Sequence, residues 1–218
     1  MKGLFIKDLK LMKGQKQFFS VVIIMMAVFL VAYTNYSFVI AYITVMFGVM
    51  TISTIGFDEQ DNGLGYLFTL PVSRKAYVKE KYLFSFATTI PALVMVSVFS
   101  LAVSRVRKVD FFIEEWVMTV AVSFLIVAVM LALLIPIQLK FGADKSRLAM
   151  MLLFGGGSLT VYAGVKVCDA FGIDYLSVID RIAELDPPVI LAGLALVCVV
   201  LMGVSCLFSL RFIEKREF

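Results

Sequence analysis

The sequence has no histidine among its 218 residues, and this absence removes several kinds of chemistry. Without histidine the chain can form no His-ligated zinc site and no Ser–His catalytic pair. Two aspartates could still form an acid pair, but no aspartate lies within a long apolar run. A glycine-rich phosphate-binding loop ending in Lys–Ser/Thr is also missing, so the chain should not bind ATP by that route. We therefore expect no catalytic residue and no metal site.

Charge is scarce as well, since only 17% of the residues are charged and 61% are hydrophobic. Soluble domains carry about 25% charged residues. No Asp, Glu, Lys or Arg occurs in residues 18–57, 82–104, 116–139, 148–165 or 187–210. A membrane-spanning helix needs about 20 apolar residues, and lipid tolerates no unpaired backbone polar group. We predict an all-α membrane protein whose six transmembrane helices lie at about 18–34, 37–57, 82–104, 114–139, 148–167 and 189–212.

Positive charge indicates the orientation of these spans. If the N-terminus is cytoplasmic, 15 of the 20 lysines and arginines fall on the cytoplasmic side and five fall outside. Cytoplasmic loops carry an excess of Lys and Arg, so we predict that both termini are cytoplasmic. No small-residue cleavage pattern follows the first apolar run, which favours an uncleaved first span over a signal peptide.

Small residues within the spans favour packing roles. Cys168, Cys198 and Cys206 lie in or beside spans without paired spacing, which is typical of small core residues and not of a disulfide frame or metal site. Gly155, Gly156 and Gly157 fall near the middle of the fifth span, where glycines let helices approach closely. A hinge or a contact with another subunit is the alternative for the glycines.

Two segments outside the spans have helical apolar patterns. In residues 1–16, Phe5, Leu9 and Met12 share one helical face, which predicts an amphipathic helix on the cytoplasmic membrane surface. The alternative is an ordinary cationic flank of the first span. Residues 169–188 are acidic and too short to span, so we predict an interfacial or re-entrant outer helix. A solvated loop helix and a contact with cargo both stay open for it.

Residues 58–81 connect the second and third spans and carry more apolar surface than a connector should leave in water. Pro71 prevents one continuous helix, and Ser73 can cap a new helix that runs into the third span. We predict a short apolar helix, a corner and a stiff helix entering the membrane. A cytoplasmic partner could push on the short helix, or the helix could dip into lipid. Its apolar residues are Leu64, Leu67, Phe68 and Leu70.

The stretch DEQDNGLGYLFTLPVSRKAYVKEKYL resembles the region after the second span in ABC-2 type transporter permeases. The six spans, the basic amphipathic N-terminus and the short helix before the last span also resemble this family. Within it, the chain looks like the small bacterial branch that includes the membrane subunits of exporters for phenol-soluble modulins and lantibiotics. The matching residues are Asp58, Glu59, Gly63, Leu67, Leu70, Pro71, Val72, Ser73, Arg74 and Lys81.

The resemblance implies a non-enzymatic permease subunit in a bacterial plasma membrane. It implies a coupling helix that contacts a separate cytoplasmic ABC ATPase, to which the N-terminal helix contributes. ATP and Mg would bind to that ATPase, and two ATPases would work with two permeases. The residues that it assigns to ATPase binding are Gly63, Leu64, Leu67, Phe68, Leu70, Pro71, Ser73 and Arg74.

The cargo and the rival functions follow from the charge-free spans. Spans without charge predict an apolar or amphipathic cargo. The resemblance implies that this cargo is a peptide, and the modest extracellular part, a departure from the family, argues against a large cargo such as a polysaccharide. We expect contacts with membrane lipid and none with nucleic acid. The alternatives are an ATP-independent secondary transporter, or a membrane immunity or assembly protein that does not transport. The first should show an internal repeat or half-helices, and the sequence shows neither.

Overall fold

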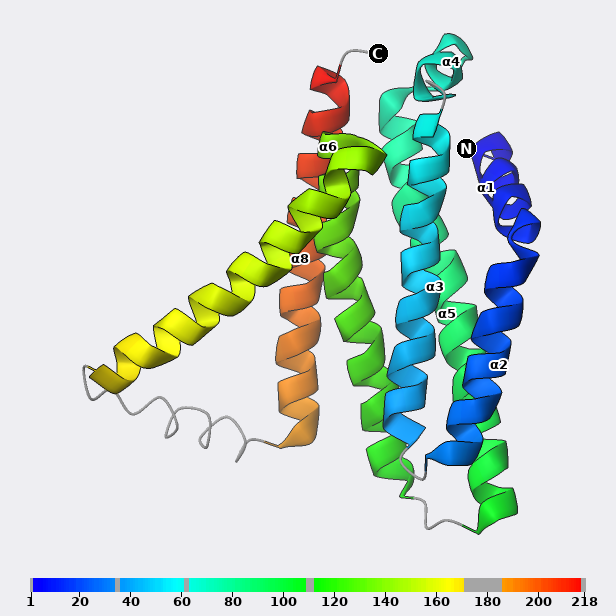
Figure 1. Cartoon of the computed structure of the whole chain (residues 1–218), viewed down its shortest axis with the longest axis vertical. Coiled ribbons are helices and arrows are strands. Elements are labelled where there is room, and N and C mark those ends of the chain that lie inside the picture. The colour runs from blue at the N-terminus through cyan, green and yellow to red at the C-terminus, as the bar shows by residue number, and fades with distance from the viewer. Residues whose placement is uncertain (1, 34–35, 61–62, 109–111, 171–185, 217–218) are drawn as a thin grey trace.

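A computed structural model of the chain describes residues 2–33, 36–60, 63–108, 112–170 and 186–216. Within these residues the structure is helical and contains no strand, which confirms the predicted all-α fold (Figure 1). The helices are α1 (Lys2–Gly14), α2 (Lys16–Ala32), α3 (Tyr36–Glu59), α4 (Gly63–Thr69), α5 (Arg74–Arg107), α6 (Ile113–Ala170) and α8 (Pro187–Lys215).

The predicted spans correspond to helices in the structure. Five helical stretches are long and apolar enough to cross a membrane: α3, α5, two parts of α6, and α8. The first predicted span corresponds to α2, which has only 17 residues and meets α1 at an angle of 66°. The described chain therefore has five candidate spans, or six if the bent pair of α1 and α2 is counted as one.

The two parts of α6 are separated by a single break. Residues 140–147 lie between the fourth and fifth predicted spans, and within them only Gly142 departs from helical geometry, with φ +77° and ψ 174°. A residue with a side chain rarely adopts this positive φ, whereas glycine does so freely. The first part, Ile113–Gly142, belongs to the bundle, and the second part, Leu148–Val167, points away from it (Figure 1). The predicted outer helix at 169–188 lies almost wholly outside the described residues.

Buried side chains form two apolar clusters along the bundle. One lies near α4 and includes Ile55, Tyr77, Leu131 and Ile135, and the other includes Val39 and Leu30 near the α2–α3 connection. The helices that contribute most to them are α3, α5 and the first part of α6, which pack side by side. Because lipid is as apolar as these side chains, close packing and internal hydrogen bonds must hold the helices together.

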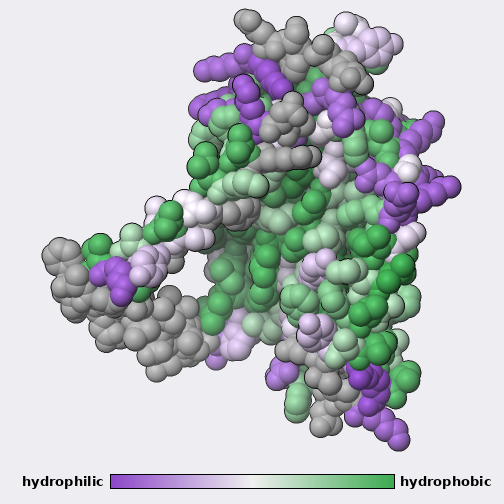
Figure 2. All heavy atoms as spheres, in the orientation of Figure 1, coloured by the Kyte–Doolittle hydropathy of each residue, from purple (hydrophilic) through white to green (hydrophobic). Residues whose placement is uncertain are grey.

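Hydrophobic residues cover the middle of the bundle, and hydrophilic residues gather at its two ends (Figure 2). The predicted packing residues differ in their surroundings. Cys198 is buried and Cys206 is half-buried, and both are free thiols, whereas the side chain of Cys168 lies outside the described part. A methyl group added at Gly155, Gly156 or Gly157 would meet no atom within 4 Å, so a packing role for these glycines stays a prediction.

Candidate functional site

The short helix α4 stands at one end of the bundle, between the end of α3 and the start of α5 (Figure 1). Its first residue is fixed by a close approach of two backbone segments. A Cβ atom on Gly63 would lie 2.7 Å from the carbonyl oxygen of Asp58, so a side chain there would force the backbone to move. Glycine at this position lets α4 turn back directly onto the end of α3.

The predicted partner-binding residues of α4 and its corner divide into an inward and an outward set. Leu64 is 2% exposed, and Leu67 and Phe68 pack against the same apolar cluster. The Phe68 ring meets the Tyr77 ring edge-on, with centroids 5.8 Å apart. Leu70 and Pro71 are exposed, and so is Tyr66, which the sequence analysis did not select. The apolar groups that α4 and its corner offer to another molecule are therefore those of Tyr66, Leu70 and Pro71.

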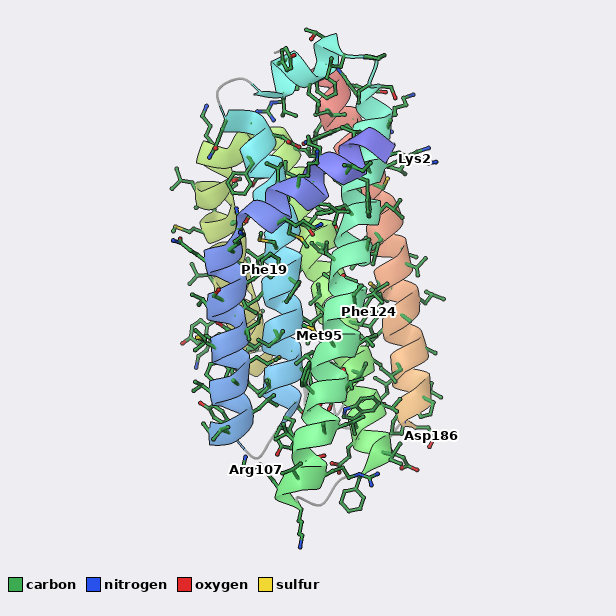
Figure 3. All side chains as sticks on the ribbon, turned by 90° about the vertical axis from the view of Figure 1, so that its right-hand side faces the viewer. Lys2, Phe19, Met95, Arg107, Phe124 and Asp186 are labelled. Carbon is green, nitrogen blue, oxygen red and sulfur yellow. The ribbon has the colours of Figure 1, made fainter. Side chains whose placement is uncertain are left out.

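Ser73 starts α5 as the sequence predicts. Its hydroxyl accepts a hydrogen bond from the backbone N–H of Ala76 at 3.2 Å, and its extended backbone forms the corner after Pro71. From Arg74, α5 continues as one helix of 34 residues to Arg107 at the opposite end of the bundle (Figure 3). The corner next to α4 is thus joined to a helix that runs the length of the bundle.

Two arginines connect this end of the bundle to α8 and α6. The Arg74 guanidinium donates to the carbonyl oxygens of Ile213 and Glu214, at 3.1 and 2.8 Å, in the last turn of α8. A cation is favourable there because the final carbonyls of a helix lack intrahelical partners. The Arg216 guanidinium pairs with the Glu59 carboxylate and donates to the Leu139 carbonyl at 3.2 Å. The ends of α3, α5, α6 and α8 are therefore tied together beside α4.

A buried cluster of charges lies next to this junction, where α1 crosses α3 and α5 (Figure 3). Asp8 and Lys81 are fully buried and paired with each other. Lys81 also lies 2.8 Å from the Asp58 carboxylate, which pairs with Lys7 on its other side. The Tyr77 hydroxyl donates to Asp58 at 3.0 Å.

This charge cluster, defined as Lys7, Asp8, Asp58 and Lys81, fixes α1 onto the bundle. Each buried ion has an oppositely charged partner, which it needs because isolated charges are costly to bury. Thr54 adds a hydroxyl that accepts from Lys81 at 3.3 Å. The cluster can therefore hold three helices in one arrangement, and a shift of α3 or α5 would disturb all its ion pairs together.

The sequence did not reveal this cluster, since it predicted an amphipathic helix on the membrane surface and not one packed on the bundle. Its apolar stripe was Phe5, Leu9 and Met12, which are only half-buried, whereas the buried face contains Leu4 and Asp8. A signal was present in the sequence, because Asp8 is the only acid among five lysines and lies one helical turn after Leu4.

Among the described residues, no three Cys, Asp or Glu side chains are placed to hold a metal ion. The residues around α4 provide an outward apolar surface. They also join α4 to its neighbours through two tight backbone corners, and the helix ends beside it are linked by ion pairs and hydrogen bonds.

Comparison with protein families gives one match. The model for a family described as ABC-2 family transporter protein matches residues 3–214, nearly the whole chain. Neither the curated proteins nor the solved structures contain a match.

Proposed function

The chain belongs to the ABC-2 family of transporter proteins, and from this we propose that it is the membrane-spanning permease subunit of a bacterial ABC exporter. Permeases of this family are transport subunits that generally work with a cytoplasmic ABC ATPase. We propose that α4 is the helix on which that ATPase acts, so that the end of the bundle carrying α4 faces the cytoplasm, as do both termini.

The outward surface of α4 and its corner carries this proposal. Tyr66 is 72% exposed and Leu70 is 45% exposed. The helix α4 stands at one end of the bundle (Figure 1), where hydrophilic residues gather (Figure 2). Large apolar groups that protrude together from a polar surface favour binding to another protein. Gly63 and Ser73 join α4 closely to α3 and α5, so a force on α4 would pass into two membrane helices.

The link from Arg74 to α8 extends this path. When α4 and the start of α5 move, the two hydrogen bonds from Arg74 carry the last turn of α8 with them. Lys81, on the same helix, would move relative to Asp8 and Asp58 and so couple α1 to the same displacement. We propose that ATP binding by the partner rearranges the spans in this way, although the chain itself hydrolyses nothing.

A cavity between α3 and α6 supports an apolar or amphipathic cargo. It has a volume of about 350 Å³ and is lined by apolar groups such as Leu134 and Met150. Its polar groups are uncharged, and they come from Ser53, Gln60, Gln138 and Ser146. A peptide with apolar side chains and amide groups fits this lining better than a large ion, which would need compensating charges. We propose a peptide as the cargo, carried by two permeases and two ATPases.

The experiment that tests the proposal uses the outward residues of α4 and its corner. The tagged permease is co-expressed with the ABC ATPase encoded nearest to its gene, and the ATPase retained after purification is measured. In the double variant Tyr66→Asp, Leu70→Asp, the contact loses two apolar groups, each worth about 1.5–3 kcal/mol when buried. Because about 1.4 kcal/mol is tenfold in affinity, retention should fall more than about tenfold.

A matched control places the same substitutions at the other end of the bundle. Val106 and Phe112 are 83% and 66% exposed there, so Val106→Asp, Phe112→Asp should leave retention unchanged. Full retention by the Tyr66, Leu70 variant would overturn the assignment of α4. Variants of Leu67 and Phe68 are less informative because these side chains also pack against the core of their own chain.

A further inference from the structure

Glu80 of α5 lies beside the charge cluster but takes no part in its ion pairs. Its side chain is buried, with the residue 1% exposed. Among the described residues, neither carboxylate oxygen has a hydrogen-bond donor or an ion-pair partner. The neighbouring Lys81 is already shared between Asp8 and Asp58. Glu80 is therefore a buried acid whose partner does not come from the described chain.

The charges around Glu80 do not balance. Lys7 and Lys81 provide two positive charges, which the two aspartates of the cluster neutralise. Glu80 lies within the electrostatic field of all four and adds a third carboxylate. Burying an unpaired carboxylate is strongly unfavourable, so a bound cation that donates hydrogen bonds would stabilise the charged form of Glu80 over the protonated one.

A cavity beside Glu80 has room for such a group, and its lining includes a lysine and three apolar side chains. Its volume is about 380 Å³, and it lies between α1 and α5. Lys2 lies at the start of α1, where that helix crosses α5 (Figure 3), and its side chain is exposed. The remaining walls are the apolar side chains of Phe5, Ile6 and Leu83, of which Ile6 and Leu83 are more than half exposed. The cavity thus combines one acid, one cation and an outward-facing apolar wall.

We propose that this cavity binds a membrane phospholipid whose headgroup carries a primary ammonium. The ammonium would donate to the Glu80 carboxylate, whose oxygens are covered in the structure and would turn into the cavity on binding, and the phosphate would pair with Lys2. The first carbons of an acyl chain would lie against Phe5, Ile6 and Leu83. A simple inorganic cation would leave the apolar wall unused, and a quaternary ammonium has no N–H to donate. The proposal extends beyond transport and depends on no contact with an ATPase.

The test compares headgroups by native mass spectrometry of the purified protein in detergent. Phosphatidylethanolamine, phosphatidylcholine and phosphatidylglycerol with identical acyl chains are titrated in turn. Since a hydrogen bond to a charged group contributes about 1.5–3 kcal/mol and about 1.4 kcal/mol is tenfold in affinity, phosphatidylethanolamine should bind at least about tenfold more tightly than the other two. Equal binding of all three lipids would overturn the proposal.

Variants identify the residues responsible. Glu80→Gln should abolish the preference for phosphatidylethanolamine over phosphatidylcholine, whereas Glu115→Gln, at an exposed acid of α6, should keep it. Lys2→Gln should weaken the binding of all three lipids alike, because each lipid carries a phosphate. A preference that survives Glu80→Gln would overturn the proposal. If that variant does not fold, Ile6→Trp serves instead: it should fill the cavity and abolish the preference, and an unchanged preference would contradict the site.

Discussion

The molecule can be divided into a first half, formed by α1 to α5 and the first part of α6, and a second half, formed by the second part of α6 and α8. The two halves differ in how much of their apolar surface is covered within the chain. In α3, 61% of the most apolar stretch is buried within the chain, but the value is 0% for the second part of α6 and 11% for α8. The first half also contains the buried charge cluster. The comparison shows that one half is held by internal contacts, whereas the other presents apolar surface that lipid or a second subunit must cover.

The less buried half is nevertheless attached to the other at defined points. Tyr82 of α5 hydrogen-bonds to Ser205 and Ser209 of α8, at 2.6 and 2.9 Å, inside the bundle. At the α4 end, Arg74 and Arg216 add the polar contacts already described. Besides these polar contacts, α8 packs against α6, and its Met202 and Leu210 lie against the apolar cluster that contains Leu131, so α8 is held by packing as well as by hydrogen bonds.

The largest effect is expected from Lys81→Met, which breaks the charge cluster in the packed half. It leaves Asp8 and Asp58 sharing only Lys7, and removing one partner of a buried ion pair costs about 3–5 kcal/mol. Since folded proteins are stable by only about 5–15 kcal/mol, the thermal unfolding temperature in detergent should fall strongly.

Two further variants separate charge from side-chain size. Lys79→Met changes an exposed lysine of the same helix and should leave the unfolding temperature nearly unchanged. The double variant Lys81→Met, Asp8→Leu leaves the balanced pair of Lys7 and Asp58, so it should recover much of the lost stability. If Lys81→Met unfolds at the same temperature as Lys79→Met, the cluster does not hold the packed half together.

This contrast also shows which features a sequence can reveal. Charge-free runs predicted the spans because lipid excludes ions from any membrane helix, whatever that helix packs against. The helix α3, at Tyr36–Glu59, closely matches the second predicted span at residues 37–57. The start of α5 at Ser73 could also be predicted, because it is determined by neighbouring residues: the Ser73 hydroxyl and the preceding Pro71. Such features depend on residues a few positions apart.

The features that were missed depend on contacts between distant segments. Asp8 and Lys81 are 73 positions apart, and their burial requires α1 to fold back across α5. The inward direction of Leu67 and Phe68 depends on the apolar cluster beneath α4, which includes Ile213 of α8.

A moderate effect is expected when glycines of the two halves are replaced alike. A Cβ on Gly48 of α3 would lie 3.0 Å from Cγ1 of Val127 and 3.4 Å from Cε of Met130, both in α6. Gly48→Leu should therefore overpack the bundle and cost about 1–3 kcal/mol, measured as a lower unfolding temperature.

The matched variant in the other half is Gly156→Leu, whose added side chain would enter open space. It should leave the stability of the single chain unchanged, apart from a gain of less than about 1 kcal/mol from better helix propensity. Chemical cross-linking in membranes then sharpens the comparison. Loss of a cross-linked dimer in this variant alone would show that the glycines contact a second subunit, and destabilisation equal to that of Gly48→Leu would contradict the difference in packing.

The smallest effect is expected at the point where the two halves meet beside α4, and it compares two adjacent cations. Lys75 pairs with Glu214 at 3.4 Å, but both side chains are about half exposed or more, so Lys75→Ala should cost no more than about 0.5 kcal/mol. Arg74→Ala removes two hydrogen bonds to carbonyls of α8, one of them part-buried, and should cost about 1 kcal/mol more. The difference can be measured as unfolding temperature and as hydrogen exchange in the last turn of α8, which should accelerate in the Arg74 variant only. Equal exchange in both variants would mean that Arg74 does not hold the last turn of α8, which would then depend on the Arg216 contacts and on the packing of Ile213.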